Sequence, residues 1–336
     1  MYSSDAASSD GRSGEDGVVA DIVVLGSANM DLVAQVDRLP RPGETIAGRG
    51  FSTVPGGKGA NQAVAAARLG ANTAMVGRVG EDGFGQILRD RLKAENINTS
   101  AFGTSKTAST GTALITLAPR DNQIVITAGA NAEMEEMDLD RLTPFFERAK
   151  VLLLQFEIPL QTVEKAAALA RLAGLTVVVD PAPAPKSGQL SKDFCEYVSI
   201  LTPNQTEAQQ LTGIEADDVE GAIAAAENLR SQGVEVVIIK MGALGSVCVT
   251  RSGSFVVPAY PVTVTDTIAA GDAFNGGLAA ALVRSPKLLN NLSDHTLLRP
   301  ALDYATAVAA LAVTESGAQS SMPTAQQVEA FLKERT

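Results

Sequence analysis

The chain alternates short apolar runs with alanine-rich segments of helical periodicity, and this alternation limits its fold more than any other feature. The apolar runs fit buried strands and lie at 21–26, 73–80, 151–156, 176–180, 199–203 and 234–242. The helical segments lie at 58–69, 84–94, 160–173, 219–231, 270–283 and 297–314. Because strands that alternate with helices usually pair in parallel, the sequence predicts an α/β fold with a parallel-rich sheet covered on both faces.

Two stretches, 32–55 and 110–128, depart from this alternation because neither contains a good helix. The second carries two β-prone runs on either side of a turn-like segment at 119–122. We expect these stretches to form a small β subdomain, a possible lid over a site. The alternative is that they are edge strands of the main sheet.

The first twenty residues are rich in Ser, Gly and Asp and contain little that could be buried. We expect them to form a disordered extension, which leaves residues 21–336 as one folded domain. They lack the basic and apolar regions of a signal peptide, and no apolar run in the chain reaches the roughly 18 residues of a membrane span. A cytoplasmic location is therefore expected.

Charge and residue usage exclude several classes of function. The net charge of −11 repels phosphate backbones and anionic lipids, so nucleic acid and membrane surfaces are not expected partners. The single histidine, His295, excludes Ser-His-Asp catalysis and metal sites with several histidines. Cys195 and Cys248 lie far apart without a CxxC pattern, so neither a zinc site nor a disulfide framework is indicated.

A glycine-rich segment, PGGKGANQA at 55–63, leads directly into the first helical stretch. Its glycines allow a ligand to approach the backbone, and free N–H groups at a helix start favour a small polar or anionic ligand. The segment is not a P-loop, because Gly59 follows Lys58 where Ser or Thr would be required. The first strand is not followed by GxGxxG, which argues against a dinucleotide-dependent oxidoreductase. A plain glycine-rich turn remains the alternative.

A second small-residue turn, DTIAAGDAFNGG at 266–277, leads into an apolar helix. The backbone amides of Ala269, Ala270 and Gly271 could form an anion hole for a phosphoryl group in transfer. The carboxylate of Asp272 could accept the proton of an attacking hydroxyl. The alternative is a structural acid that interacts favourably with the helix dipole.

Together the two segments resemble the signatures of the ribokinase-like (PfkB) family of sugar and nucleoside kinases. The resemblance covers essentially everything after residue 20, and GSANMD, TPNQTEA and AVTESGAQ are most similar to the ribose-phosphorylating branch of that family. It implies a three-layer α/β/α fold with a mostly parallel central sheet and a small β-sheet lid. It also implies an ATP-dependent kinase of a small sugar.

The resemblance further implies a sugar site built from both signatures and two other segments. Its residues would be Asn29, Asp31, Gly57, Lys58, Gly59, Ala60, Asn61, Glu157 and Asp272. This set suits a ribose, which offers only hydroxyls, because carboxylates and amides accept from and donate to hydroxyls with defined orientation. Without the resemblance, Asn29 would be interpreted as a turn former and Glu157 as a surface acid.

The resemblance implies a nucleotide site in the second half of the chain. Its residues would be Asn204, Lys240, Gly242, Ala243, Gly245, Gly271 and Thr306. Asn204 and Glu207 match the family's Asn-x-x-Glu element, which is expected to hold Mg²⁺ through water; one acid is enough because magnesium keeps its waters. The alternative for PNQTEA is an ordinary helix start. Lys240 stands where some family members have threonine, and Thr306 where asparagine or histidine is frequent.

The resemblance to the ribose-phosphorylating branch also implies activation by potassium, bound by a loop beside the phosphate pocket. The matching positions are Asp266, Ile268, Ala312, Glu315, Gly317 and Ser321. Carbonyl oxygens would replace the water shell of this weakly hydrated ion, and the ordered loop would help form the anion hole. The alternative at 315–317 is an ordinary turn.

The reaction implied is an in-line transfer from Mg-ATP to D-ribose. Asp272 would accept the O5 proton as that oxygen attacks the γ-phosphoryl, which gives ribose 5-phosphate and ADP. The lid would exclude water, and in relatives two lids often pair to form a homodimer. The alternatives are a kinase of fructose, 2-keto-3-deoxygluconate or a nucleoside, and a non-catalytic sugar or nucleotide sensor. The nucleoside is least favoured, because the lid stretches offer little beyond Phe51 to hold a base.

Overall fold

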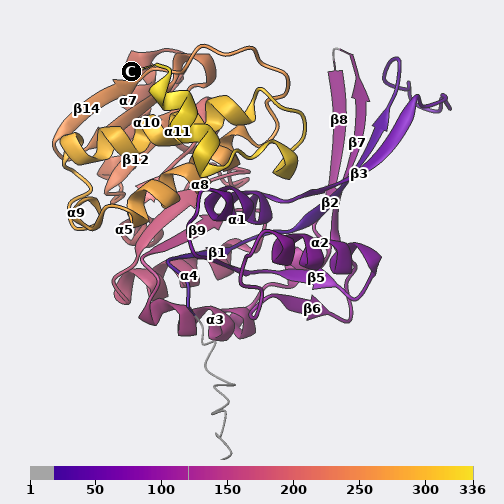
Figure 1. Ribbon diagram of the computed structural model, residues 1–336, viewed down its shortest axis with the longest axis horizontal. Helices are drawn as coiled ribbons and strands as arrows, with labels where there is room; N and C mark the ends of the chain where they lie inside the picture. The colour runs from indigo at the N-terminus through magenta and orange to yellow at the C-terminus, as the bar shows by residue number, and fades with distance from the viewer. Residues whose placement is uncertain (1–18, 120, 336) are drawn as a thin grey trace, which may run out of the picture.

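The computed structural model describes residues 19–119 and 121–335 and is built around an eight-stranded sheet (Figure 1). In sheet order the strands are β14 (Gly253–Val257), β13 (Ser246–Thr250), β12 (Val236–Lys240), β11 (Ile200–Leu201), β10 (Thr176–Asp180), β9 (Val151–Gln155), β1 (Ile22–Leu25) and β4 (Thr73–Val76). The strands from β12 to β4 pair in parallel, whereas β13 and β14 are antiparallel. The predicted parallel-rich α/β sheet is confirmed.

Helices cover both faces of this sheet, and each face has its own apolar core. Successive β1 residues alternate between the two cores: Ile22 enters one and Val23 the other. The first core includes residues of α1 (Lys58–Arg68), α2 (Gly83–Ala94), α8 (Ala270–Val283), α9 (Pro286–Leu289), α10 (His295–Ala312) and α11 (Ala325–Lys333). The second includes residues of α3 (Glu136–Leu142), α4 (Leu160–Leu172), α5 (Lys192–Tyr197), α6 (Gln205–Thr212) and α7 (Val219–Ser231).

The six predicted helices are all present, with ends within two residues of those expected. One predicted strand was wrong, because the run 73–80 does not stay in one sheet. The chain leaves the central sheet at Gly77, and β5 (Arg78–Gly80) pairs with β6 (Gly103–Ser105) in a separate two-stranded sheet. A Cβ on Gly77 would lie 2.6 Å from the Phe102 ring, so the chain can pass here only without a side chain.

A second, four-stranded sheet projects from one side of the molecule (Figure 1). Its order is β3 (Gly50–Gly56), β2 (Asn29–Gln35), β7 (Gly111–Ala118) and β8 (Asp121–Thr127). These strands do not pair with the central sheet, so the expected small β-sheet is confirmed and the edge-strand alternative was wrong. We call these four strands the lid sheet.

The predicted disordered extension covers residues 1–20, of which residues 1–18 lie outside the described part of the chain. Ala20, the last residue of the predicted extension, is 1% exposed and belongs to the second core, so the packed chain begins before residue 21. Within the ranges 19–119 and 121–335, no helix is both long and apolar enough to span a membrane.

Candidate active site

A cavity of about 710 Å³ opens where several parallel strands end. Asp180 ends β10 and Lys240 ends β12, and both line this cavity together with the first turn of α8. In open α/β sheets, the carboxyl ends of the strands are the usual place for a ligand. All the residues predicted for the nucleotide line the cavity, namely Asn204, Lys240, Gly242, Ala243, Gly245, Gly271 and Thr306.

The first turn of α8 lines the same cavity and contains the predicted anion hole. Ala269 precedes the helix with φ 60°, a left-handed conformation that is unusual for a residue with a side chain. This turn places Ala269, Ala270 and Gly271 on the cavity wall beside Asp272. The Ala270 amide donates a long bond of 3.3 Å to the Thr267 carbonyl. The start of α8 can therefore present backbone amides to an anion in the cavity.

Asp272 is 4% exposed, and two amide side chains of α1 hold its carboxylate. Asn61 Nδ2 donates to Oδ2 at 2.9 Å, and Gln62 Nε2 donates to Oδ1 at 3.1 Å. Burial raises the pKa of Asp272, while the charge of Lys58 and the two amides act in the opposite direction. Helices α1 and α8 can pack this closely because a Cβ on Gly276 would overlap Ala65.

Glu157 follows β9, and its carboxylate lies at the start of α1, beside the first glycine-rich segment. Its Oε2 accepts hydrogen bonds from Ser27 Oγ at 2.5 Å and from the Lys58 amide at 3.0 Å. Burial, together with the charge of Glu157, raises the pKa of Asp31 to about 7. A Cβ on Gly59 would lie 2.7 Å from the Gly26 carbonyl carbon, so glycine is required where α1 meets the turn after β1. Asp31 and Glu157, two of the acids predicted for the sugar site, therefore lie close enough to interact.

Asn29 begins the lid sheet, and its side chain is oriented by Asn131, a residue that the sequence did not indicate. Asn131 Nδ2 donates to Asn29 Oδ1 at 2.7 Å, and Asn131 Oδ1 accepts from the Ala28 amide at 3.0 Å. Since the oxygen of Asn29 is already engaged, its amide nitrogen is the group available to a ligand. The GAN tripeptide after the second β stretch carries no recognisable motif, so only tertiary packing identifies Asn131.

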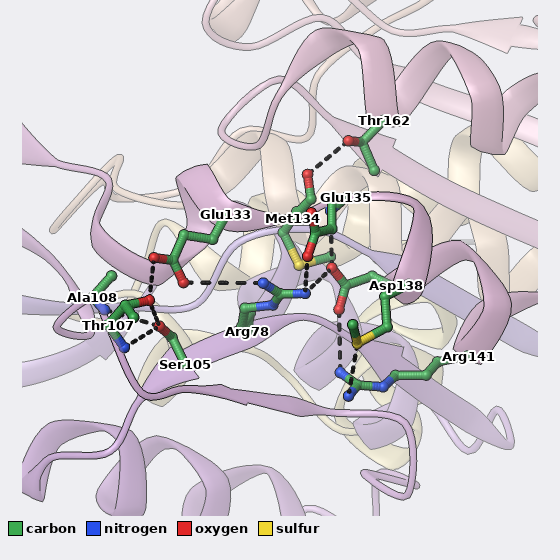
Figure 2. A network of polar contacts seen from close by, with 11 residues as sticks. Arg78, Ser105, Thr107, Ala108, Glu133, Met134, Glu135, Asp138, Arg141 and Thr162 are labelled. Atoms are coloured by element: carbon green, nitrogen blue, oxygen red, sulfur yellow. Dashed lines mark hydrogen bonds and ion pairs between the residues drawn. The ribbon is translucent and has the colours of Figure 1, made fainter.

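A buried ionic network holds the segment that carries Asn131 (Figure 2). Arg78 of β5 is 8% exposed, and its Nη2 lies 2.7 Å from Oδ2 of the fully buried Asp138 in α3. Its Nη1 lies 4.0 Å from Glu133, at the end of the 3-10 helix η1 (Gly129–Glu133). Asn131 lies in η1, so this network ties η1 to the body of the protein.

Sequence reasoning also missed two residues that support Asp272. Gln62 donates both to Asp272 and, at 3.2 Å, to Oδ2 of Asp180. Asp180 Oδ1 in turn lies 2.8 Å from Lys240 Nζ. An acid at the end of a fully buried strand was the one available signal for Asp180, because buried charges are usually paired.

Asn204 and Glu207 adopt the geometry of a helix cap at the start of α6. Asn204 Oδ1 accepts from the Glu207 amide, and Glu207 Oε2 accepts from the Asn204 amide, both at 2.8 Å. Burial and the nearby Asp180 raise the pKa of Glu207. Within the described residues no three His, Cys, Asp or Glu side chains could hold a metal together. This oxygen-only set, with one carboxylate oxygen outside the cap bonds, fits a hydrated Mg²⁺ bound mainly by phosphates.

The residues expected around potassium come from the turn before α8 and from the segment between Ala312, the last residue of α10, and Ser321, the last residue of the 3-10 helix η4 (Gln319–Ser321). Asp266 Oδ1 accepts from the Ile268 amide at 2.9 Å, and Oδ2 accepts from the Gly317 amide at 3.0 Å. These bonds bring Asp266, Ile268 and Gly317 together. The other three positions, Ala312, Glu315 and Ser321, make hydrogen bonds within their own segment. The Glu315 amide donates to the Ala312 carbonyl, and Ser321 Oγ donates to the Ala318 carbonyl. Two loops rich in backbone carbonyls fit a weakly hydrated monovalent ion.

Comparisons with known proteins agree with this geometry. The profile of the pfkB family carbohydrate kinases matches residues 19–325. The chain is 40% identical to ribokinase from Haemophilus influenzae, over 93% of this chain and 98% of that protein, and 35% identical to deoxyribokinase from Salmonella typhi, over 93% and 98%. It superposes with a TM-score of 0.83 on the structure of Arabidopsis thaliana ribokinase complexed with ribose and ATP, at 31% identity over 94% of this chain and 99% of that one. The chain therefore belongs to the pfkB family of carbohydrate kinases.

Proposed function

We propose that this protein is a ribokinase, which transfers the γ-phosphoryl group of ATP to the O5 hydroxyl of D-ribose and releases ribose 5-phosphate and ADP. One observation carries the proposal. Asp272 lies buried on the wall of the cavity, directly after the backbone amides at the start of α8, and Asn61 and Gln62 fix both of its oxygens. An oriented acid beside an anion-binding helix start is what phosphoryl transfer to an alcohol requires.

Asp272 would accept the O5 proton while that oxygen attacks the γ-phosphorus and the bond to the leaving ADP oxygen breaks. In a loose transition state the hydroxyl loses its proton late, so a positioned carboxylate suffices despite its modest basicity. Burial strengthens this base by raising the pKa of Asp272, and the charge of Lys58 acts in the opposite direction by favouring the carboxylate. The amides of Ala269, Ala270 and Gly271 would stabilise the charge that develops on the transferred group.

The sugar would lie between the first glycine-rich segment and the lid sheet. Asn29 would donate through its free amide nitrogen, and the carboxylates of Asp31 and Glu157 would accept from hydroxyls. Lys58 and Asn61, at the start of α1, would complete the contacts together with the backbone of Gly57, Gly59 and Ala60. A closed lid sheet would keep water from competing as the acceptor.

Two ions belong to the proposal. Mg²⁺, held by Asn204 and Glu207 together with the nucleotide, would neutralise charge on the phosphate oxygens. K⁺ would bind between the two loops joined by Asp266 and Gly317, and would order the turn that leads into α8. The expected cytoplasmic location also remains a prediction.

We propose a homodimer formed through the lid sheet. Strand register places Ile126 opposite Ala113 and Asp31, and Ile124 opposite Ile115 and Val33, so these side chains share one face. Ile124 is 51% exposed and Ile126 is 57% exposed, which is unusual for large apolar side chains. A second lid sheet on this face would bury both isoleucines and cover the sugar site at the same time.

The proposal is tested by measuring ADP release from ATP and Mg²⁺ with D-ribose, 2-deoxy-D-ribose, D-fructose, 2-keto-3-deoxygluconate and adenosine. Each acceptor is assayed with K⁺ and with Na⁺ as the only monovalent cation. We expect fast, potassium-dependent release with D-ribose. A preference for another acceptor would retain the kinase chemistry and refute ribose as the substrate. Acceptor-dependent thermal stabilisation without ADP release would indicate a sugar sensor instead.

A further inference from the structure

Lys240 places its amine inside the cavity beside a buried acid. Its side chain is 15% exposed, and Nζ lies 2.8 Å from Oδ1 of Asp180, whose side chain is 2% exposed. Both residues stand at the ends of their strands and both line the cavity. A lysine paired in this way is held in one orientation, because charge-assisted hydrogen bonds are short and strong in a partly buried site.

The amine is adjacent to the proposed anion hole. A Cβ built on Gly271, the residue before the proposed base, would lie 3.2 Å from Lys240 Nζ. Gly271 lies in the first turn of α8, and the residues of this turn line the cavity. The lysine charge and the helix start therefore converge on the same corner of the cavity, where an anionic group would interact with both.

A second polar group points to a ligand in that corner. Ser246 of β13 lies opposite Lys240 in the strand register and lines the cavity. It is 2% exposed, and in the described part of the chain its hydroxyl has no hydrogen-bond partner. A buried hydroxyl without a partner costs about 1–3 kcal/mol unless a ligand satisfies it, so a polar ligand group is expected here.

Asp180 connects Lys240 to the proposed base. Its second oxygen accepts from Gln62 Nε2, and the same nitrogen donates to Asp272. Gln62 is itself fixed, because its Oε1 accepts from Gln155 Nε2 at 2.7 Å. The cation on one side and the base on the other are thus positioned by one hydrogen-bonded chain.

We propose that Lys240 is a catalytic residue, which donates to a non-bridging oxygen of the γ-phosphoryl group, and that Asp180 is its positioning residue. The proposal rests on the proposed phosphoryl transfer and extends it. The lysine keeps its proton throughout; the bond from phosphorus to ADP breaks and the bond to the acceptor oxygen forms. Its charge would offset the charge that builds up on the phosphoryl oxygens in the transition state.

The test compares nucleotide binding by calorimetry in the absence of sugar, so it does not depend on which acceptor the enzyme uses. Lys240→Met removes the charge and keeps the length of the side chain, and Lys165→Met, at an exposed ion pair with Glu136, is the matched control. We expect Lys240→Met to bind β,γ-methylene ATP about tenfold or more weakly, while ADP affinity stays within about twofold, because only the triphosphate carries the group contacted. The control should leave both affinities unchanged.

Turnover gives a second readout. Lys240→Met should lower kcat by about 10²-fold or more with little change in sugar KM, and Asp180→Asn should lower kcat less. If Lys240→Met is too unstable to study, Lys240→Met combined with Asp180→Asn removes both buried charges. This double variant should show the same selective loss of affinity for the ATP analogue.

If folded Lys240→Met loses affinity equally for both nucleotides, or for neither, the γ-phosphoryl contact is refuted and the proposed function still stands. A wild-type protein that binds no nucleotide would overturn both proposals.

Discussion

Asp272 owes its proposed role to its surroundings, since an aspartate in the first turn of a helix also has a structural use. Two neutral amides hold its oxygens, and Lys58 supplies a positive charge nearby. Asp272→Asn retains the shape and removes the base. We expect kcat for D-ribose to fall about 10³-fold or more with a modest change in ribose KM, measured by ADP release.

The control for that substitution is Asp140→Asn, at an exposed position of α3, which should leave kcat unchanged. If Asp272→Asn retains turnover within about tenfold of the wild-type enzyme, Asp272 does not act as the base.

Asp31 should make sugar binding depend on pH. With a pKa of about 7, Asp31 is mainly a carboxylate above that pH, and a carboxylate accepts from a sugar hydroxyl more strongly than the protonated acid does. We expect kcat/KM for ribose to rise between about pH 6 and pH 8 and then level off. In Asp31→Asn this rise should disappear, and an unchanged pH profile in the variant would assign the titration to another group.

The raised pKa of Asp31 makes stability depend on pH in the opposite direction to sugar binding. Because the pKa is raised above the unfolded value of 3.8, the folded protein holds the Asp31 proton more tightly than the unfolded chain does. The contribution of Asp31 to the free energy of unfolding is therefore fully present below about pH 4 and is lost as the pH rises through about 7. Asp31 thus favours folding most at the pH where it binds sugar least, which is common for groups buried for function.

At the scale of elements, Arg78 joins β5, η1 and α3 around the fully buried Asp138 (Figure 2). Among the described residues, Arg78→Met would leave the buried Asp138 carboxylate with one cation, Arg141 at 3.3 Å, which is 39% exposed, and with a hydrogen bond from the Glu135 amide. We expect the free energy of unfolding, measured with urea, to fall by about 3–5 kcal/mol.

Two further variants test whether the buried charge causes that loss. Arg78→Met combined with Asp138→Asn removes both charges, so its free energy of unfolding should fall clearly less than that of Arg78→Met alone. Lys165→Met, at an exposed ion pair, should change stability by no more than about 0.5 kcal/mol. An equally small effect of Arg78→Met would show that the network contributes little to stability.

At the scale of the whole molecule, the lid sheet exposes an apolar face that a single chain leaves in contact with solvent. Replacing both Ile124 and Ile126 with lysine should convert a dimer into a monomer, measured by light scattering after size exclusion, because charge is disfavoured in an interface core. Leu172→Lys is the matched control, since Leu172 is 79% exposed on α4 and outside the lid sheet. A wild-type protein that is already monomeric would contradict the proposed dimer.

The sequence determined the elements of the central domain and most of the ligand-binding residues. Apolar periodicity located the six long helices and the parallel strands, because burial on one or both faces imposes a pattern that local sequence carries. The two glycine-rich signatures indicated Asp272 and Asn61, because backbone approach to a ligand requires small residues at fixed spacing.

Tertiary structure alone decided how the site is supported. Asn131, Asp180 and Arg78 lie in segments that look like ordinary loop or strand, and Gln62 lies in the first signature without a role that the sequence assigns to it. The partners of these four residues are 60 to 210 residues away along the chain. Nothing in the local sequence indicates that the chain leaves the central sheet at Gly77, because this departure depends on close contact with the Phe102 ring. Hydrogen bonds and close contacts between distant segments leave no local period in the sequence, so only the folded chain shows which polar residues position the base and the cation.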